Sequence, residues 1–322
     1  MKKYIYWVLG ILFFLITIFL YNSIYFDIPR NTLEEEYVSD SFFISLDDNT
    51  KIHVKDQGNK NKPSIFVLHG FNSSLFDFEE LSTQLSKDYR VISFDFPAFG
   101  LTGATTSKNY SIEYYLKVVE SIKSYFDLDQ IVLIGHSMGG HVSWRYAEER
   151  PEDVRGIVLL APGGIGSEQD ILDFKSQKNA PLAWKLANSS FGSQMLLYFT
   201  PKFFVREGLK DSIVNDSLVT DDWVNSFHDM VLLEGSREAI GEILRSIKNP
   251  FDDPLMLKNI NSPVMLIHGT DDNLINVNVT NIYSKNISNL DLKIYENVGH
   301  WPAQENPDRA LKDIKHFLSG LN

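Results

Sequence analysis

The sequence predicts an α/β protein with a mostly parallel, eight-stranded sheet that carries helices on both faces. Short runs of apolar, often β-branched residues alternate along the chain with stretches of helical periodicity. These runs lack a polar residue at every second position, as strands that are buried on both faces should. Hydrophobic residues make up 43% of the 322 residues and charged residues 22%. This composition is typical of a globular protein and excludes a disordered or fibrous chain.

The first 26 residues differ from the rest. Residues 4–21 form an apolar run without charge or proline, directly after Lys2 and Lys3. As a helix this run would rise about 27 Å, close to the hydrocarbon thickness of a bilayer. We expect one transmembrane helix, an uncleaved signal anchor, in residues 1–26. A cleaved signal peptide is the alternative, although the run is long for one and no small-residue cleavage site follows it. The lysines place the N-terminus in the cytoplasm and the chain from Asp27 onward on the extracytoplasmic side.

The strand pattern divides the remaining chain into four parts. Residues 27–40 are a predicted linker, and residues 41–166 are the first part of the sheet domain. Between residues 167 and 253 the strand pattern is lost, and helical periodicity and aromatic residues prevail. This segment is too long for a loop, so we expect a helical insertion. Residues 254–322 complete the sheet domain.

Each strand is marked by its own apolar run. The first two form a hairpin, because the turn-forming residues 47–50 separate them. The expected strands are residues 41–46, 51–55, 64–68, 91–94, 131–134, 157–160, 264–267 and 292–295. Helices are expected between strands, for example over residues 111–126 and over residues 139–150, where Pro151 ends the helix.

Charge and cysteine content exclude several kinds of partner and chemistry. The net charge of −12 and the lack of a basic stripe argue against nucleic acid as a partner. The chain has no cysteine, which excludes disulfides, thiolate nucleophiles and cysteine-ligated zinc. Nothing in the sequence predicts an oligomeric state.

The strongest motif is Gly135-His136-Ser137-Met138-Gly139, which lies between a strand and a helix. A sharp strand-to-helix turn brings backbones close together, so Gly135 and Gly139 leave room that a Cβ would fill. Ser137 is then presented at the edge of the sheet and the start of a helix, where a developing anion is favoured. A tight turn with Ser137 as a plain helix cap is the structural alternative.

A serine nucleophile needs a base and a carboxylate that orients this base. Asp271 and Asp272 follow one predicted strand, and His300 follows the next. The order serine, aspartate, histidine and the position of each residue after a strand favour His300 as the general base.

Residues 69–71, His-Gly-Phe, end the strand over residues 64–68. Acyl transfer builds negative charge on a carbonyl oxygen, and paired backbone N–H groups stabilise it. We expect the N–H of Met138 and that of Phe71 to form this oxyanion hole. His69 is expected to brace the loop.

Together these stretches resemble the α/β-hydrolase fold family, and the resemblance extends from residue 42 to residue 317. It implies that Asp272 is the catalytic acid, with Asp271 as the alternative, and that residues 167–253 are a helical cap (lid) over the active site. Haloalkane dehalogenases and epoxide hydrolases of this fold use an aspartate nucleophile, so Ser137 argues against both. Ala98 departs from the family pattern, in which a glycine is usual, and implies a differently shaped loop.

The cap segment contains candidate substrate-pocket residues. Trp184, Phe191, Phe199 and Phe203 gather apolar bulk in a short stretch. They could form an acyl or aromatic pocket, or a face that rests on the bilayer. Equally, they could be the core of the cap itself.

The sequence therefore predicts a membrane-anchored serine hydrolase that cleaves a carboxylic ester, with a lipid or hydrophobic acyl ester favoured. It needs no metal and no organic cofactor. A carbon–carbon bond hydrolase or an amidase or aminopeptidase with the same triad is the enzymatic alternative. A catalytically silent, hydrolase-like binding module is the alternative from another class.

Overall fold

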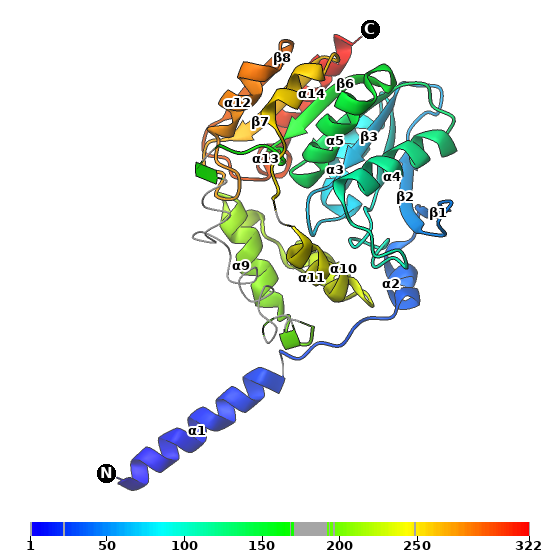
Figure 1. Ribbon diagram of the computed structural model, residues 1–322. Coiled ribbons are helices and arrows are strands. Elements are labelled where there is room, and N and C mark those ends of the chain that lie inside the picture. The colour runs from blue at the N-terminus through cyan, green and yellow to red at the C-terminus, as the bar shows by residue number, and fades with distance from the viewer. Residues whose placement is uncertain are drawn as a thin grey trace.

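The computed structural model describes residues 2–21, 23–167, 169, 170, 192, 194, 195, 197–247 and 249–321. Figure 1 shows a sheet between helices, further helices at one end of this sheet, and an N-terminal helix that points away from both. The predicted pocket residues Trp184 and Phe191 lie outside the described residues.

The sheet has eight strands in the order β1-β2-β4-β3-β5-β6-β7-β8. They are β1 (Phe42–Ser45), β2 (Lys51–Gln57), β3 (Ser64–Leu68), β4 (Arg90–Phe94), β5 (Ile131–His136), β6 (Val154–Leu160), β7 (Val264–Gly269) and β8 (Leu290–Tyr295). Neighbours from β4 to β8 are parallel, whereas β2 is antiparallel to both β1 and β4. The predicted number of strands is confirmed, but the sheet is mixed. The hairpin reverses the chain, and β2 then joins β4 in the opposite direction.

The strand order determines where a site can form. The chain leaves β3, forms β4 on one side of it, and returns to form β5 on the other side. The connections that follow β3 and β5 therefore diverge at the carboxyl ends of these two strands. In open α/β sheets active groups gather at such a point.

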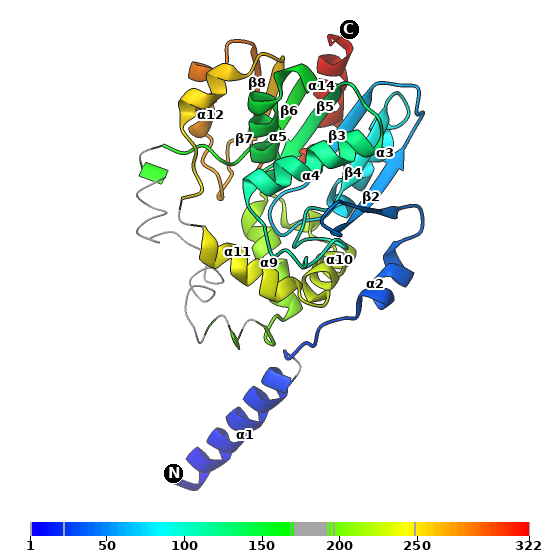
Figure 2. The ribbon, with the colours of Figure 1, turned by 45° about the vertical axis from the view of Figure 1, so that its right-hand side comes forward.

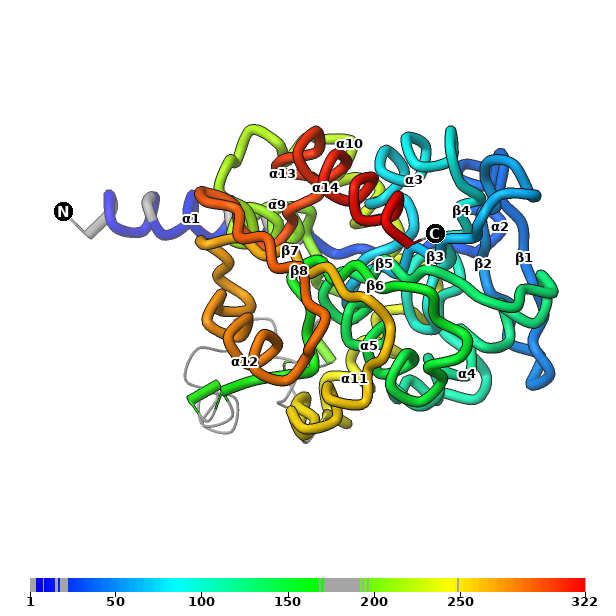
Figure 3. The backbone as a smooth tube through the Cα atoms, turned by 90° about the horizontal axis from the view of Figure 1, so that it is seen from above, coloured from blue at the N-terminus to red at the C-terminus, as the bar shows by residue number. Residues whose placement is uncertain are grey.

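Helices cover both faces of the sheet, as predicted. Figure 3 shows one layer of helices on each side of the strands, and Figure 2 shows α4 and α5 in front of the sheet. The first layer contains α3 (Glu79–Leu85), α13 (Pro302–Glu305) and α14 (Pro307–Ser319), and the second contains α4 (Ile112–Tyr125), α5 (Met138–Glu149) and α12 (Val279–Asn286).

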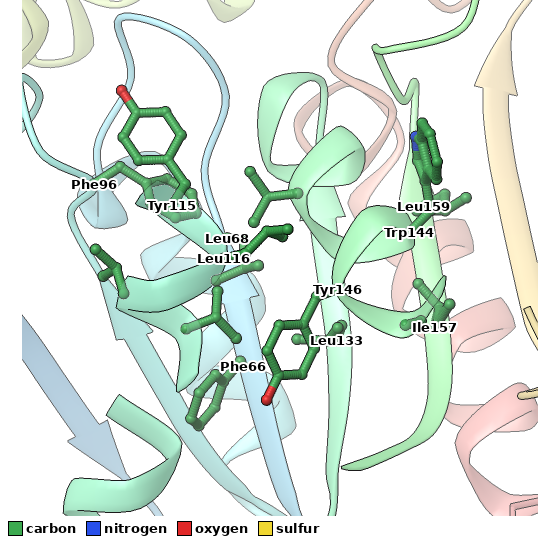
Figure 4. Close-up of a cluster of buried hydrophobic side chains, with 14 of the residues drawn as sticks. Phe66, Leu68, Phe96, Tyr115, Leu116, Leu133, Trp144, Tyr146, Ile157 and Leu159 are labelled. Atoms are coloured by element: carbon green, nitrogen blue, oxygen red, sulfur yellow. The ribbon is translucent and has the colours of Figure 1, made fainter. Parts of the chain in front are cut away.

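The core lies on both faces of the sheet, and its larger cluster lies between the sheet and the second layer. Figure 4 shows Phe66 and Leu133 of the sheet near Tyr146 of α5, and Tyr115 of α4 near Phe96. All five side chains are at most 2% exposed. Burial of a large apolar side chain contributes about 1.5–3 kcal/mol, so this layer fixes the central strands that carry the site.

Between β6 and β7 the described chain is helical, in the segment that is predicted as the cap. The helices are α9 (Lys202–Ser212), α10 (Asp221–Leu232) and α11 (Ser236–Ser246). Thr220 caps α10 by accepting a hydrogen bond from the N–H of Trp223. Figure 1 shows these helices at one end of the sheet.

The N-terminal helix α1 (Lys2–Tyr21) extends away from the other elements. Among the residues that the structure describes, no helix combines the length and the apolar character that crossing a membrane requires. The predicted transmembrane helix is therefore not confirmed.

Residues 23–38, here called the strap, run along the cap helices and include α2 (Arg30–Tyr37). The N–H of Ile28 donates to the carbonyl of Leu232 at 2.7 Å, and the Arg237 guanidinium pairs with Asp27. Leu33, only 1% exposed, joins a small apolar cluster with Met230 and other residues. The strap includes most of the predicted linker and fastens α10 and α11 to the rest of the molecule.

Candidate active site

The turn between β5 and α5 holds Ser137 in a strained conformation. Its φ is 51° and its ψ is −114°, a region that residues with a side chain rarely adopt. A Cβ on Gly135 would lie 2.3 Å from the carbonyl oxygen of Gly139, and one on Gly139 would lie 2.2 Å from that of Leu68. Only glycine fits at either position, so these residues enforce the sharp turn that presents Ser137 at the edge of the sheet.

His300 and Asp272 form a buried pair at the same edge. The Nδ1 of His300 lies 2.8 Å from Oδ2 of Asp272, and the two residues are 4% and 7% exposed. Oδ1 of Asp272 accepts hydrogen bonds from the N–H groups of Leu274 and Ile275, each at 2.8 Å. Asp271, by contrast, is exposed and accepts from the hydroxyl of Thr270. The geometry pairs Asp272, not Asp271, with the imidazole.

Electrostatics keep Asp272 ionised. Burial alone would raise the pKa of this carboxyl, but the nearby His300 and hydrogen bonds from His268 and His300 outweigh it. The pKa of Asp272 is therefore held well below its usual range. An ionised carboxylate can orient the imidazole and stabilise the imidazolium that proton uptake would form.

Ser137 and His300 are connected through the residue before Ser137. Among the described hydrogen bonds, none joins the hydroxyl of Ser137 to His300. Instead, Nε2 of His136 lies 2.8 Å from the carbonyl oxygen of His300. Catalytic hydrogen bonds are often long before a substrate binds, so the lack of this bond is compatible with Ser137 and His300 as a nucleophile and its base.

The loop after β3 lies against the serine turn. His69 is fully buried; its Nδ1 lies 2.7 Å from the carbonyl oxygen of Gly70, and its Nε2 accepts a hydrogen bond from the N–H of Phe96. Burial lowers the pKa of His69 and keeps it neutral, so it braces this loop. A Cβ on Gly70 would lie 3.2 Å from Cβ of Ser137. The loop and Ser137 are therefore close neighbours.

The N–H groups of Phe71 and Met138 lack acceptors among the hydrogen bonds of the described residues. Met138 begins α5, where the first N–H groups of a helix have no partner within it. Met138 follows Ser137 directly, and Phe71 follows Gly70, which lies close to Ser137. Stabilisation of an oxyanion requires a pair of such donors.

The described pocket candidates lie in the cap, near the strap. Phe199 forms an isolated bridge with Ile24, and its ring lies 5.8 Å from that of Phe204. Phe203 is 43% exposed and also contacts Phe204. A role of these residues in substrate binding stays a prediction.

Sequence reasoning missed the contacts between the cap segment and the loops of the candidate site. The N–H of His300 donates to the carbonyl of Ser212 in α9 at 2.7 Å. Trp223 of α10 donates from Nε1 to Oδ1 of Asp77 at 2.6 Å, and its ring meets that of Trp301 edge to face. Trp301 follows His300 directly, a position that could have suggested such a role.

A groove of about 1150 Å³ lies beside these contacts but is not lined by the serine, histidine or aspartate of the site. Its walls include Asp77, Trp223 and Gln304, and its rim is rich in carboxylates. Among the described residues, no group of three or more histidine, aspartate or glutamate side chains is arranged to hold a metal ion.

A serine on a strained turn, a buried histidine–aspartate pair and free N–H donors at the carboxyl edge of a mixed sheet define a hydrolase-type site. The model of the alpha/beta hydrolase fold family matches residues 63–307, and the chain belongs to this family.

Named relatives agree with this membership. The chain is 24% identical over 277 residues to the uncharacterized hydrolase YugF of Bacillus subtilis, covering 84% of this chain and 95% of that protein. It is 26% identical over 272 residues to the monoacylglycerol lipase ABHD6 of Mus musculus, covering 81% and 77% of the two chains. The structure of the meta-cleavage product hydrolase CumD of Pseudomonas fluorescens has a TM-score of 0.74 at 20% identity, covering 87% and 98%. This last likeness shows a shared fold.

Proposed function

We propose that the protein is a serine hydrolase that cleaves a carboxylic ester, with a lipid or other hydrophobic acyl ester as substrate. The observation that carries the proposal is the 2.8 Å contact between His300 and the ionised Asp272, at the sheet edge that also presents Ser137. The order of Ser137, Asp272 and His300 along the chain, each after a strand end, supports these roles, because it is the order typical of acyl transfer on this fold.

In the proposed reaction, the hydroxyl oxygen of Ser137 attacks the ester carbonyl carbon while Nε2 of His300 takes its proton. The tetrahedral intermediate collapses, the bond to the alcohol oxygen breaks, and His300 returns the proton to the leaving alcohol. Water then attacks the acyl-enzyme with the same base, which releases the acid and restores Ser137. Asp272 stays ionised throughout and orients the imidazole.

Oxyanion stabilisation comes from the backbone in this proposal. The N–H groups of Phe71 and Met138 donate to the carbonyl oxygen as it gains charge. One such donor is worth about 2.7–4 kcal/mol in the barrier, because it is already oriented when the charge develops. Backbone donors also explain why side chains as different as Phe71 and Met138 serve the role.

The lipid preference is supported by the name of the mouse relative, a monoacylglycerol lipase. Aromatic side chains in the cap are a second support, since Tyr198 is 56% exposed and Phe203 43%. A series of glycerol monoesters and p-nitrophenyl esters with acyl chains of increasing length, with and without detergent, tests it. We expect kcat/KM to rise with chain length; a maximum at the shortest chains would contradict it.

We also propose that residues 1–26 attach the chain to a membrane, with the catalytic part on the extracytoplasmic side. The support is the uncharged apolar sequence after Lys2 and Lys3. The full-length chain should sediment with membranes after an alkaline carbonate wash, whereas a chain without residues 1–26 should not. Full-length protein in the supernatant would contradict the attachment.

The test of the activity itself is Ser137→Ala. We expect the variant to fold but to lose ester hydrolysis and labelling by a fluorophosphonate probe. Retained hydrolysis would refute the nucleophile. If the unaltered chain is not labelled at Ser137, the silent binding module is favoured instead. Turnover of an amide or of a carbon–carbon substrate in preference to all esters would keep the triad and change the substrate class.

A further inference from the structure

His136 contacts each of the three loops of the proposed site. It is the last residue of β5, directly before Ser137, and is 2% exposed. Its Nε2 lies 2.8 Å from the carbonyl oxygen of His300, 164 positions away in the sequence. One imidazole therefore links the nucleophile turn to the backbone of the base.

The carbonyl oxygen of His300 determines which ring nitrogen of His136 carries the proton. A carbonyl oxygen can only accept, so Nε2 carries the proton and donates it to His300. Burial, and next the charge of a protonated His300, lower the pKa of His136 to about 3. The ring is therefore neutral, and its Nδ1 is buried without a partner among the described residues. Leaving an acceptor unpaired has a free-energy cost, so the bond from Nε2 to His300 is the polar contact that this buried ring provides.

The other side of this ring faces the loop after β3, residues 69–71, here called the oxyanion loop. A Cβ on Gly70 would lie 3.0 Å from Nδ1 of His136, tighter than an ordinary contact. The ring centroid of His136 lies 4.5 Å from that of Trp301 and 4.8 Å from that of His300. The imidazole thus fills the space between the loops after β3, β5 and β8.

The loop after β8 that carries His300, here called the base loop, accepts one hydrogen bond and donates another through the backbone of His300. The cap accepts the N–H of His300 through Ser212, and the sheet domain donates to its carbonyl through His136. Without the donor on His136, the contact with Ser212 would be the remaining hydrogen bond on the backbone of His300 among those of the described residues.

We propose that His136 is a positioning residue that sets His300 and the oxyanion loop in register with Ser137. The proposal rests on the function proposed above, in which Ser137 attacks and His300 accepts its proton. Displacing reacting groups by about 1 Å can cost about 100-fold in rate, so one hydrogen bond on the base loop is sufficient to matter.

The test compares two amides at position 136 in the full-length chain. In His136→Gln the side-chain N–H can reach the place of Nε2, whereas in His136→Asn it is too short to reach the carbonyl of His300. Both are neutral and polar, and His136→Leu serves as the variant without a donor. Each is assayed for kcat and KM on a p-nitrophenyl ester, for the rate of fluorophosphonate labelling, and for its thermal midpoint.

We expect Asn and Leu to lower kcat and the labelling rate about 100-fold with little change in KM, and Gln to restore most of the loss. An Asn variant as active as the unaltered chain would overturn the proposal. So would a Gln variant that melts normally and is as slow as Asn. Hydrolysis that survives Ser137→Ala would instead overturn the function on which the proposal rests.

Discussion

The serine turn and the cap both contact the backbone of His300, the turn through His136 and the cap through Ser212. The two regions differ in how the sequence specifies them. On the turn side, residues 135–139 form a contiguous motif whose backbone geometry follows from two glycines. On the cap side, the carbonyl of Ser212 accepts the N–H of His300, and Trp223 reaches Asp77 across 146 positions. The nucleophile turn is thus specified locally, whereas the contacts of the cap depend on residues far apart in the sequence. We expect changes to the turn, or to the proposed base and acid beside it, to abolish activity and changes on the cap side to tune it.

The largest effect is expected for Asp272→Asn. An amide at this position cannot stabilise the imidazolium and favours the wrong tautomer of His300, so kcat should fall about 10⁴-fold. Steady-state kinetics on a p-nitrophenyl ester measures it. The matched control is Asp271→Asn, which alters an exposed neighbour and should leave kcat nearly unchanged. Equal losses in both variants would mean that the paired geometry does not identify the catalytic acid.

The second effect concerns space at the turn. In Gly139→Ala the new Cβ would lie 2.2 Å from the carbonyl oxygen of Leu68 and 2.5 Å from that of His69. Backbone cannot yield as a flexible side chain would, so the free energy of unfolding should fall by about 3 kcal/mol or more. Urea unfolding measures this change.

A matched glycine on the cap sharpens the comparison. Gly208 lies in α9 and has no atom within 4 Å of an added Cβ. Gly208→Ala should stabilise the protein by about 0.5–1 kcal/mol, because alanine loses less conformational freedom in a helix. A destabilised Gly208→Ala and a tolerated Gly139→Ala would reverse the contrast drawn between the two regions.

The same contrast explains what could be predicted from the sequence. The alternation of strands and helices and the strand count were predictable, because each strand has its own apolar run. The antiparallel hairpin of β1 and β2 was predictable from its turn residues, but its antiparallel pairing with β4 was not, since no residue pattern says which neighbour the hairpin joins. Ser137 and His300 were predictable as site candidates from local motifs, whereas the choice of Asp272 over Asp271 depended on family resemblance until the pairing was seen.

Contacts made across the fold leave little trace in the sequence. The strap resembles a linker in the sequence, because the acidic run Glu34-Glu35-Glu36 follows the buried Leu33 directly and masks its apolar signal. Trp223 and Asp77 follow no common spacing, so their hydrogen bond could be recognised only once α10 lay against the loop after β3. Tertiary packing decides such pairs, and local periodicity cannot.

The third effect is a pH dependence of the free energy of unfolding that His136, beside the serine turn, should cause. The pKa of His136 is about 3 in the folded protein and 6.5 ordinarily, so between these values the unfolded chain binds a proton that the folded chain does not. Stability is therefore lost as the pH falls below 6.5, and this residue should remove about 2 kcal/mol between pH 7 and pH 5. Urea unfolding at both pH values measures the loss in the unaltered chain and in His136→Gln. The difference between the two losses isolates His136, and equal losses would show that it is not buried in its neutral form.

The smallest effect is expected on the cap side, for Trp223→Phe. Phenylalanine keeps an aromatic ring against Trp301 but removes the N–H that Trp223 donates to Asp77, an interaction worth about 1 kcal/mol net and somewhat more if the carboxyl stays unpaired. Because Asp77 keeps its bonds from Ser73 and Ser74, the protein should fold normally. The cap would loosen over the base loop, and kcat should fall by less than about tenfold.

A double-mutant cycle of Trp223→Phe with Asp77→Ala tests whether this is one interaction. The pair should show a coupling energy of about 1 kcal/mol, because each single change already removes the shared hydrogen bond. Additive effects would mean that Trp223 acts through its ring on Trp301 alone. A fall in kcat as deep as that of Asp272→Asn would go further. It would place the cap within the catalytic machinery and end the distinction between a side that performs the reaction and a side that tunes it.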